Sequence, residues 1–448
     1  MATAAPLVKH AASLLRPGHS NCVAFPDIHQ PGLSFSLVPR AATQWHDEDW
    51  FMGGLNYHLA VTFDDGVCWL ARIRQKNGNP RKLQSLVSEF VTLKALNRAC
   101  PEFVPNVWMP QASPLGPPFF FMEHFKGSNS RHLFPRSGAR PVESQTIVSD
   151  MATFLIQLSS LEIRGDIGSL TASSAVVDAA TDLEPEPVVG PFEHWDYCIS
   201  NGLTTLGPFR TSRDAWVAKI DAVVLALERG LFAINGGHLL HVYLVHLEMR
   251  ALVNACEEMA VPCGPGDGEQ PTFITHADSK NHLLVTDDGH LRAVIDWEGA
   301  YTAPFAEAFA APMGFYDQRG FVRGSNELST EEVLLADIFQ SRGRKDMAQA
   351  VRGGRKYHRL AFHLGTLQPT LEMVNALYDA FLGEESASCI RFDSLFEWEA
   401  AALHKFSHVP GLEQLAIPPG EGDVAYLRFA EVEPDANWCK VVTVKDAS

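Results

Sequence analysis

Two apolar runs near the start of the chain predict a β-hairpin. Residues 57–63 (YHLAVTF) and 67–73 (VCWLARI) are rich in β-branched and aromatic side chains, and an Asp-Asp-Gly turn separates them. After a break at 77–80, apolar side chains recur every three or four residues over 82–98, which predicts an amphipathic helix. A third run, FFFME at 119–123, is apolar throughout and predicts a buried strand.

Helical periodicity dominates the rest of the chain. The expected helices lie at about 145–162, 212–229, 238–256, 330–351 and 371–382. The stretch 170–192, rich in Ala, Ser, Asp and Pro, predicts a surface loop, and 415–448 predicts an irregular tail. A strand-rich first part is therefore followed by a helical second part.

The length and net charge of the chain limit the number of domains and the kinds of partner that we expect. The 448 residues suffice for two or three domains of roughly 100–200 residues each. Lys and Arg number 36 against 53 Asp and Glu, so the net charge is −17, which argues against nucleic-acid and anionic-membrane partners. No window of about 18 uncharged apolar residues and no secretory signal occur, so we expect a cytoplasmic protein.

The cysteines and the N-terminus add little chemistry. The eight cysteines form no CxxC pair, which favours reduced thiols over zinc ligands or disulfides. The first 26 residues contain Lys9 and Arg16 but no acid. The segment LVKHAASLLR is interpreted as a surface helix, and the alternative is a mitochondrial presequence.

Candidate chemistry concentrates in residues 272–298. An apolar strand leads to His276-Ala277-Asp278, and a second hairpin, at 283–285 and 291–296, ends at Asp296. Two acids at adjacent strand ends suit a Mg-nucleotide site, because oxygen ligands hold the metal while one carboxylate orients an attacking hydroxyl.

This segment resembles the catalytic and metal loops of the aminoglycoside phosphotransferase-like family, relatives of the protein kinases that phosphorylate small molecules. HADSKNHLLV resembles the family's H-G/A-D-x-x-x-x-N-I-L-V loop, and AVIDWEGA resembles its I-D-[WF]-E motif. Upstream, GGLNYHLAVTFDDGVCWLARI resembles the glycine-containing loop and hairpin, SEFVTLKAL the first helix, and PLGPPFFFMEHFKG the hinge. The motifs are colinear over about 50–312.

The resemblance implies a protein-kinase-like α+β fold of two lobes, a small lobe with an antiparallel sheet and a larger, mainly helical lobe. The implied parts are an N-terminal extension at 1–50, a nucleotide-binding N-lobe at 51–125, a catalytic and substrate C-lobe at 126–414 and a C-terminal tail at 415–448. It also implies ATP or GTP and Mg²⁺ as cofactors.

Site roles follow from the same resemblance. Asp278 is the implied catalytic aspartate, His276 braces its loop, and Asp296 binds Mg²⁺. Arg72 occupies the position of a phosphate-binding cation, with Glu89 as its ion-pair partner. The implied nucleotide-binding backbone comprises the glycines Gly53 and Gly54 and the hinge residues Met122, Glu123, His124 and Phe125.

The catalytic loop departs from the family pattern. In kinase-like loops the metal-binding Asn follows the catalytic Asp by about five positions, whereas Asn281 follows Asp278 by three. Aligning LLV with the family's I-L-V places His282 in the Asn position instead. Either Asn281 or His282 reaches the metal, the imidazole being the poorer Mg²⁺ ligand, or the second metal site is lost.

Three functions remain open. The first is transfer of the γ-phosphoryl group of ATP to a hydroxyl of a small molecule. The surplus of acidic residues could suit an acceptor molecule that carries positive charge. The second is a non-catalytic nucleotide-binding or scaffolding relative, suggested by the short loop. The third is a metal-dependent hydrolase built from His276, Asp278, His282 and Asp296, which leaves the hairpin, helix and hinge unexplained.

Overall fold

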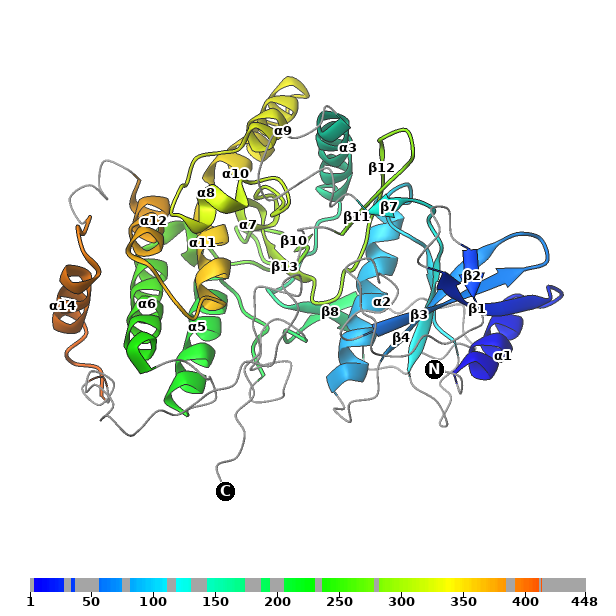
Figure 1. The fold of residues 1–448 in the computed structure, drawn as a ribbon, viewed down its shortest axis with the longest axis horizontal. Helices are drawn as coiled ribbons and strands as arrows, with labels where there is room; N and C mark the ends of the chain where they lie inside the picture. Colours follow the sequence, from blue (N-terminus) through cyan, green and yellow to red (C-terminus); the bar gives the residue numbers. More distant parts are fainter. Residues whose placement is uncertain are drawn as a thin grey trace.

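The computed structural model shows a sheet-containing lobe beside a mainly helical lobe (Figure 1). The blue and cyan strands lie at the right of the view, and the green to orange helices lie at the left. The structure describes residues 4–27, 34–36, 56–74, 81–110, 118–129, 143–173, 187–193, 205–229, 236–277, 282–383, 391–410 and 412. The expected α+β class with two lobes is confirmed.

The expected hairpin forms the centre of a six-stranded sheet. Its strands are β3 (Asn56–Phe63) and β4 (Cys68–Arg74), which pair antiparallel. Gly66 closes the turn with φ 83°, a value that favours glycine. The sheet order is β2-β1-β3-β4-β6-β5, so β6 lies inside the sheet, as its unbroken apolar run predicts. The other strands are β1 (Asn21–Asp27), β2 (Ser34–Ser36), β5 (Val107–Trp108) and β6 (Phe119–Glu123).

A helix covers each face of this sheet. The expected helix is α2 (Arg81–Ala99), whose Phe90 ring packs 5.8 Å from Phe120. The opposite face is covered by α1 (Ala5–Leu15), whose Val8 and Ala12 are fully buried against β3 and β4. The segment at 1–50 therefore contributes both a helix and strand β1 to the small lobe, and the packing supports the interpretation of LVKHAASLLR as a helix of the fold.

The larger lobe is built mainly from helices, and none among the described residues has the length and apolar character needed to cross a membrane. Its helices are α3 (Glu143–Leu158), α5 (Ser212–Glu228), α6 (Gly236–Ala255), η2 (Glu257–Ala260), α7 (Phe305–Ala308), α8 (Gln318–Val322), α9 (Thr330–Ser341), α10 (Lys345–Gly353), α11 (Arg355–Leu364), α12 (Leu371–Leu382) and α14 (Leu395–Lys405).

Two expectations about this lobe are wrong. The helix expected over 330–351 is broken between α9 and α10, because Gly343 has φ 79°, outside the right-handed helical region. The loop expected over 170–192 begins and ends in paired strands, β8 (Ser169–Ala172) and β9 (Pro187–Gly190). A Cβ at Gly168 would collide with the carbonyl oxygen of Gly190, so glycine permits this close approach. The expected tail at 415–448 lies outside the described residues.

Five short strands position the candidate site. The expected second hairpin is confirmed as β11 (Leu283–Val285) and β12 (Leu291–Val294), and β7 (Ser128–Asn129) pairs with β11 just after the hinge. The strand leading to His276 is β10 (Thr272–Thr275), which pairs with β13 (Tyr301–Pro304). His276 follows β10 and Asp296 lies just beyond β12, so the ends of strands from two separate sheets contribute to the candidate site.

Candidate functional site

Arg72 of β4 carries a buried guanidinium at the junction of the two lobes. Its Nε donates to Glu89 Oε2 on α2 at 2.8 Å, which confirms the expected ion pair. Its Nη2 donates to Asp296 Oδ1 of the large lobe at 2.7 Å. Arg72 is only 6% exposed, so these contacts form where water is largely excluded. The structure thus brings together three residues singled out from the sequence.

A third acid, Glu298, binds the same arginine and was not singled out from the sequence. Its Oε2 accepts from Arg72 Nη2 at 3.2 Å and its Oε1 from Arg74 Nη1 at 2.5 Å. Asn56 Nδ2 donates to Oε2 at 2.6 Å, and the Ser85 hydroxyl lies 3.5 Å from Oε1. Two sequence features could have pointed to Glu298, namely its place as the Glu of the IDWE motif and the second arginine two residues after Arg72.

Three carboxylates therefore face two guanidiniums. The carboxylates belong to Glu89, Asp296 and Glu298, and the guanidiniums to Arg72 and Arg74. Burial disfavours the charged form of Arg72, but the three acids outweigh it and raise the pKa of Arg72. Burial, with repulsion from Glu298 and Asp296, raises the pKa of Glu89 despite its bond to Arg72. Counted formally, the cluster has one more acid than bases, and the raised pKa of Glu89 offsets that surplus by favouring its protonated form.

Asp296 sits in an unusual backbone conformation just beyond β12. Its φ is 62°, and it is the one non-glycine residue in the described part of the chain with a positive φ. Such backbone conformations in non-glycine residues cluster at functional sites. Burial works against ionisation, but the charges of Arg72, His282 and His276 outweigh it and hold the pKa of Asp296 well below its usual value. The carboxylate is ionised at neutral pH.

His276 and His282 lie beside Asp296. The Nε2 of His276 donates to the carbonyl oxygen of Ile295 at 2.9 Å, and its ring packs 4.7 Å from Trp297. The two imidazole rings are stacked at 5.7 Å, and His282 Nδ1 lies 3.5 Å from Asp296 Oδ2. These contacts fit the bracing role expected of His276, and they show that His282 faces Asp296.

The expected hinge begins at the end of β6, and some of its backbone groups are bonded within the protein. The N–H of Glu123 donates to Asn106 O at 2.8 Å, and that of His124 donates to Cys68 O at 3.2 Å. Burial and the charge of Lys126 lower the pKa of His124 to about 4, so its ring is neutral at pH 7. The Arg292 guanidinium lies 3.8 Å over the Phe125 ring. The backbone N–H groups of Glu123 and His124 are therefore not free for a purine.

Four expected site residues lie outside the described residues, namely Gly53, Gly54, Asp278 and Asn281. Ala277 is the last described residue before the catalytic position, and the description resumes at His282. The hydrolase hypothesis finds no support in the neighbouring side chains. Among the described residues, His276, His282 and Asp296 do not bring three ligand atoms within 4.8 Å of one another. His276 is instead bonded to backbone.

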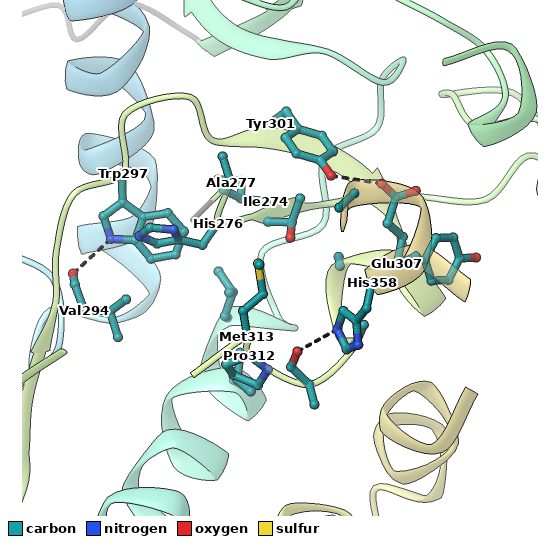
Figure 2. A pocket seen from close by; sticks show the side chains of 18 of the residues that line it. Ile274, His276, Ala277, Val294, Trp297, Tyr301, Glu307, Pro312, Met313 and His358 are labelled. Carbon is teal, nitrogen blue, oxygen red and sulfur yellow. Dashed lines mark hydrogen bonds between the residues drawn. The ribbon is translucent and has the colours of Figure 1, made fainter. Parts of the chain in front are cut away.

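A cavity of about 110 Å³ lies between β10, β13, α3 and α11 (Figure 2). His276, Ala277 and Met313 contribute to its wall. Among the described residues, Glu307 is the one acid in the lining, and its oxygens accept from Tyr301, Ser212 and Trp216 at 3.0, 2.8 and 3.2 Å. The described part of the wall therefore presents no uncommitted carboxylate to a cationic ligand.

The chain is similar to several solved structures and matches the model of one protein family. No curated protein matches the chain. Solved structures that resemble it include a macrolide 2′-phosphotransferase type I, with 16% identity over 90% of this chain and 97% of that one and a TM-score of 0.39. Another is the aminoglycoside phosphotransferase APH(4)-Ia bound to AMP-PNP and hygromycin B, with 16% identity, coverages of 74% and 92% and a TM-score of 0.41. A Plasmodium vivax ethanolamine kinase has 11% identity, coverages of 81% and 82% and a TM-score of 0.40.

Similarities at this level carry no functional argument by themselves. The stronger finding is the match of residues 53–311 to the model of a protein family described as the phosphotransferase enzyme family. This span includes the hairpin, α2, the hinge and the IDWE motif, and it covers more than half of the chain. The chain therefore belongs to the phosphotransferase enzyme family.

Proposed function

We propose that the protein transfers the γ-phosphoryl group of ATP to a hydroxyl group of a small molecule. The observation that carries the proposal is the buried Arg72 guanidinium, bonded to Glu89 at 2.8 Å and to Asp296 at 2.7 Å. A cation held between the sheet lobe and an ionised carboxylate suits the binding of nucleotide phosphates. The nucleotide-binding lobe spans 51–125 with α1 and β1 packed on it, and 126–414 forms the catalytic and substrate lobe.

Asp296 suits Mg²⁺ better than its neighbours do. It offers the hard oxygen ligands that Mg²⁺ prefers, and its side chain is 39% exposed. The oxygens of Glu298 are occupied by Arg72 and Arg74, and the imidazole of His282 suits softer metals. When bound, Mg²⁺ neutralises charge on the phosphates.

The remaining steps belong to side chains of this chain. Arg72 binds and orients the phosphates. The Gly53-Gly54 backbone and the hinge segment Met122–Phe125 position the nucleotide, the hinge through groups other than the bonded N–H groups of Glu123 and His124. Asp278 accepts the proton of the acceptor hydroxyl. A bond forms between the acceptor oxygen and the γ-phosphorus, and the bond from that phosphorus to the β–γ bridging oxygen breaks. ADP leaves with the bridging oxygen. The protein contributes positioning and charge rather than a covalent intermediate.

Nucleotide binding is tested first by thermal unfolding with ATP or GTP, each with Mg²⁺ or with EDTA. We expect stabilisation by ATP that is larger with Mg²⁺. GTP stabilisation in place of ATP would change the phosphoryl donor, and no stabilisation by either would refute the proposal.

Turnover is then measured as ADP release with a panel of hydroxyl compounds that includes amino sugars, macrolides and amino alcohols. We expect at least one acceptor, and a loss of about 100-fold or more in turnover for Asp278→Ala. Tight Mg-ATP binding without turnover on any acceptor would instead favour the non-catalytic alternative.

A further inference from the structure

We propose that Glu298 is a positioning residue that ties the small lobe to the large lobe and fixes Arg72 against Asp296. The inference deepens the proposed function and rests on it for its effect on nucleotide binding. Glu298 follows Asp296 by two residues, yet its side chain is only 8% exposed, against 39% for Asp296. The two acids of the IDWE motif therefore have different surroundings.

Four side chains of the small lobe bond to Glu298. Asn56 lies on β3, Arg72 and Arg74 on β4, and Ser85 on α2. The donors are also bonded to one another, because Arg74 Nη1 donates to Asn56 Oδ1 at 3.1 Å and Nη2 to Ser85 Oγ at 3.2 Å. We call Glu298, Arg74, Asn56 and Ser85 the interlobe tie. It connects one point of the large lobe to three elements of the small lobe.

The carboxylate oxygens of Glu298 already accept several hydrogen bonds, which gives this residue a different role from Asp296. Each carboxylate oxygen of Glu298 has an arginine donor within 3.2 Å and a second polar donor. A metal at Glu298 would have to displace buried, charge-assisted hydrogen bonds. Asp296 has one arginine bond and a more exposed side chain. Glu298 therefore acts through the arginines rather than on the nucleotide.

One nitrogen of Arg72, the expected phosphate ligand, is shared between Asp296 and Glu298, which connects the interlobe tie to the phosphate-binding position. Arg72 Nη2 donates both to Asp296 Oδ1 and to Glu298 Oε2, so Glu298 limits rotation of the guanidinium about its bond to Glu89. Arg74 is 3% exposed, and Glu298 is its one carboxylate partner among the described residues. Loss of Glu298 would free Arg72 to rotate and would leave Arg74 as a buried unpaired charge.

The test separates positioning from stability with two variants. Glu298→Gln removes the charge and leaves Arg74 unpaired, so it is expected to lower the unfolding temperature. In the double variant Glu298→Gln/Arg74→Met the unpaired charge is gone, and stability is expected to recover. The Kd for Mg-ATP, measured by calorimetry well below the unfolding temperature, is expected to stay about 10-fold weaker than wild type in both, a change of about 1.4 kcal/mol.

A matched control is the buried pair of Glu332 and Arg355, which lies within the large lobe at 2.6 Å. Glu332→Gln/Arg355→Met is expected to change stability and to leave the Kd for Mg-ATP unchanged. Recovery of wild-type Kd in the Glu298→Gln/Arg74→Met variant would overturn the proposal, because Glu298 would then serve stability alone.

A second measurement does not depend on nucleotide binding. Spin labels attached through p-acetylphenylalanine at the exposed positions Leu14 in α1 and Val333 in α9 report the distance between the lobes, and they avoid the exposed Cys22. We expect a broader distance distribution in Glu298→Gln/Arg74→Met than in wild type, and no broadening in the control pair. Identical distance distributions in wild type and Glu298→Gln/Arg74→Met would overturn the proposed role of the interlobe tie. Failure of the wild type to bind nucleotide would refute the proposed function and leave this measurement valid.

Discussion

Arg72 and Asp296 are 224 residues apart in the chain, and Nη2 of the first donates to Oδ1 of the second at 2.7 Å. The contact links the strand that carries the expected phosphate ligand to the motif that carries the expected metal ligand. It also means that, without nucleotide, Arg72 satisfies part of the charge of Asp296. Nucleotide phosphates would draw on the same guanidinium, so Arg72 is expected to matter for both folding and binding.

Replacing Arg72 should lower both the stability of the fold and the affinity for nucleotide, by an amount that depends on the substitution. Arg72→Met leaves Glu89, Asp296 and Glu298 without a shared cation, and we expect a loss of about 3–5 kcal/mol in the free energy of unfolding. Arg72→Lys keeps the charge but cannot bond three carboxylates with one planar fork, so an intermediate loss is expected. Urea unfolding and calorimetry with Mg-ATP measure the two effects. Equal Kd values for wild type and both variants would exclude Arg72 from phosphate binding.

Asp296→Asn should separate metal dependence from folding. Asn adopts positive φ more readily than most residues, and its amide oxygen can still accept from Arg72, so the unfolding temperature should change little. The additional stabilisation that Mg²⁺ gives to the ATP complex should be lost, because a neutral amide is a weaker Mg²⁺ ligand than a carboxylate. Thermal unfolding with ATP plus Mg²⁺ or EDTA measures this difference. Asp296→Gly, which accommodates the same φ without an oxygen ligand, is the control and should also lose it.

Local sequence patterns were sufficient to predict the helices and strands around the candidate site. The strands of the β3–β4 hairpin, helix α2, strand β6 and the β11–β12 hairpin all lie where apolar periodicity and turn residues placed them. Each has an apolar pattern within its own residues, along one face or throughout as in β6, so the neighbouring positions in the chain carry the information. The resemblance then identified Arg72, Glu89 and Asp296, which the structure brings together.

Features that depend on distant partners were missed. Helix α11, with the sequence RKYHRLAFHL, turns four polar residues into the core, namely Arg355, His358, Arg359 and His363. Periodicity counts such residues as exposed, although Arg355 is satisfied by Glu332 and Arg359 by backbone carbonyls and Asn326. The bond of Glu298 to Arg74 likewise spans 224 residues, and no local pattern indicates it.

The packing of α1 on the sheet predicts that this helix is needed for stability. Val8 is fully buried against the sheet face that carries Trp69 and Phe121, whereas Leu14 is 61% exposed. Val8→Asp would bury an unpaired charge or expel the helix, and we expect a loss of about 3 kcal/mol or more in the free energy of unfolding. Leu14→Asp should change it by about 0.5 kcal/mol or less. Equal urea midpoints for the two variants would show that α1 contributes little to the fold.

The buried histidines predict a loss of stability in mild acid. Burial is the largest cause that lowers the pKa of His246 to about 4 and those of His358 and His363 to about 3. The unfolded chain protonates them near pH 6.5, whereas the folded protein keeps them neutral until far lower pH. The unfolded state therefore binds more protons below pH 6.5, and stability falls as the pH decreases toward 4. Each histidine contributes a slope of up to about 1.4 kcal/mol per pH unit.

Urea unfolding at pH 7.5, 6.5 and 5.5 measures this slope, and a His363→Gln variant tests its origin. That variant removes one titrating group of α11, whose Nε2 donates to the carbonyl oxygen of Met373 at 3.2 Å. Its stability at pH 7.5 is expected to be lower than that of wild type, while its decline between pH 6.5 and 5.5 should be shallower. A wild-type free energy of unfolding that stays constant over this range would contradict the neutral, buried state of these histidines, because three proton uptakes on unfolding could not then occur.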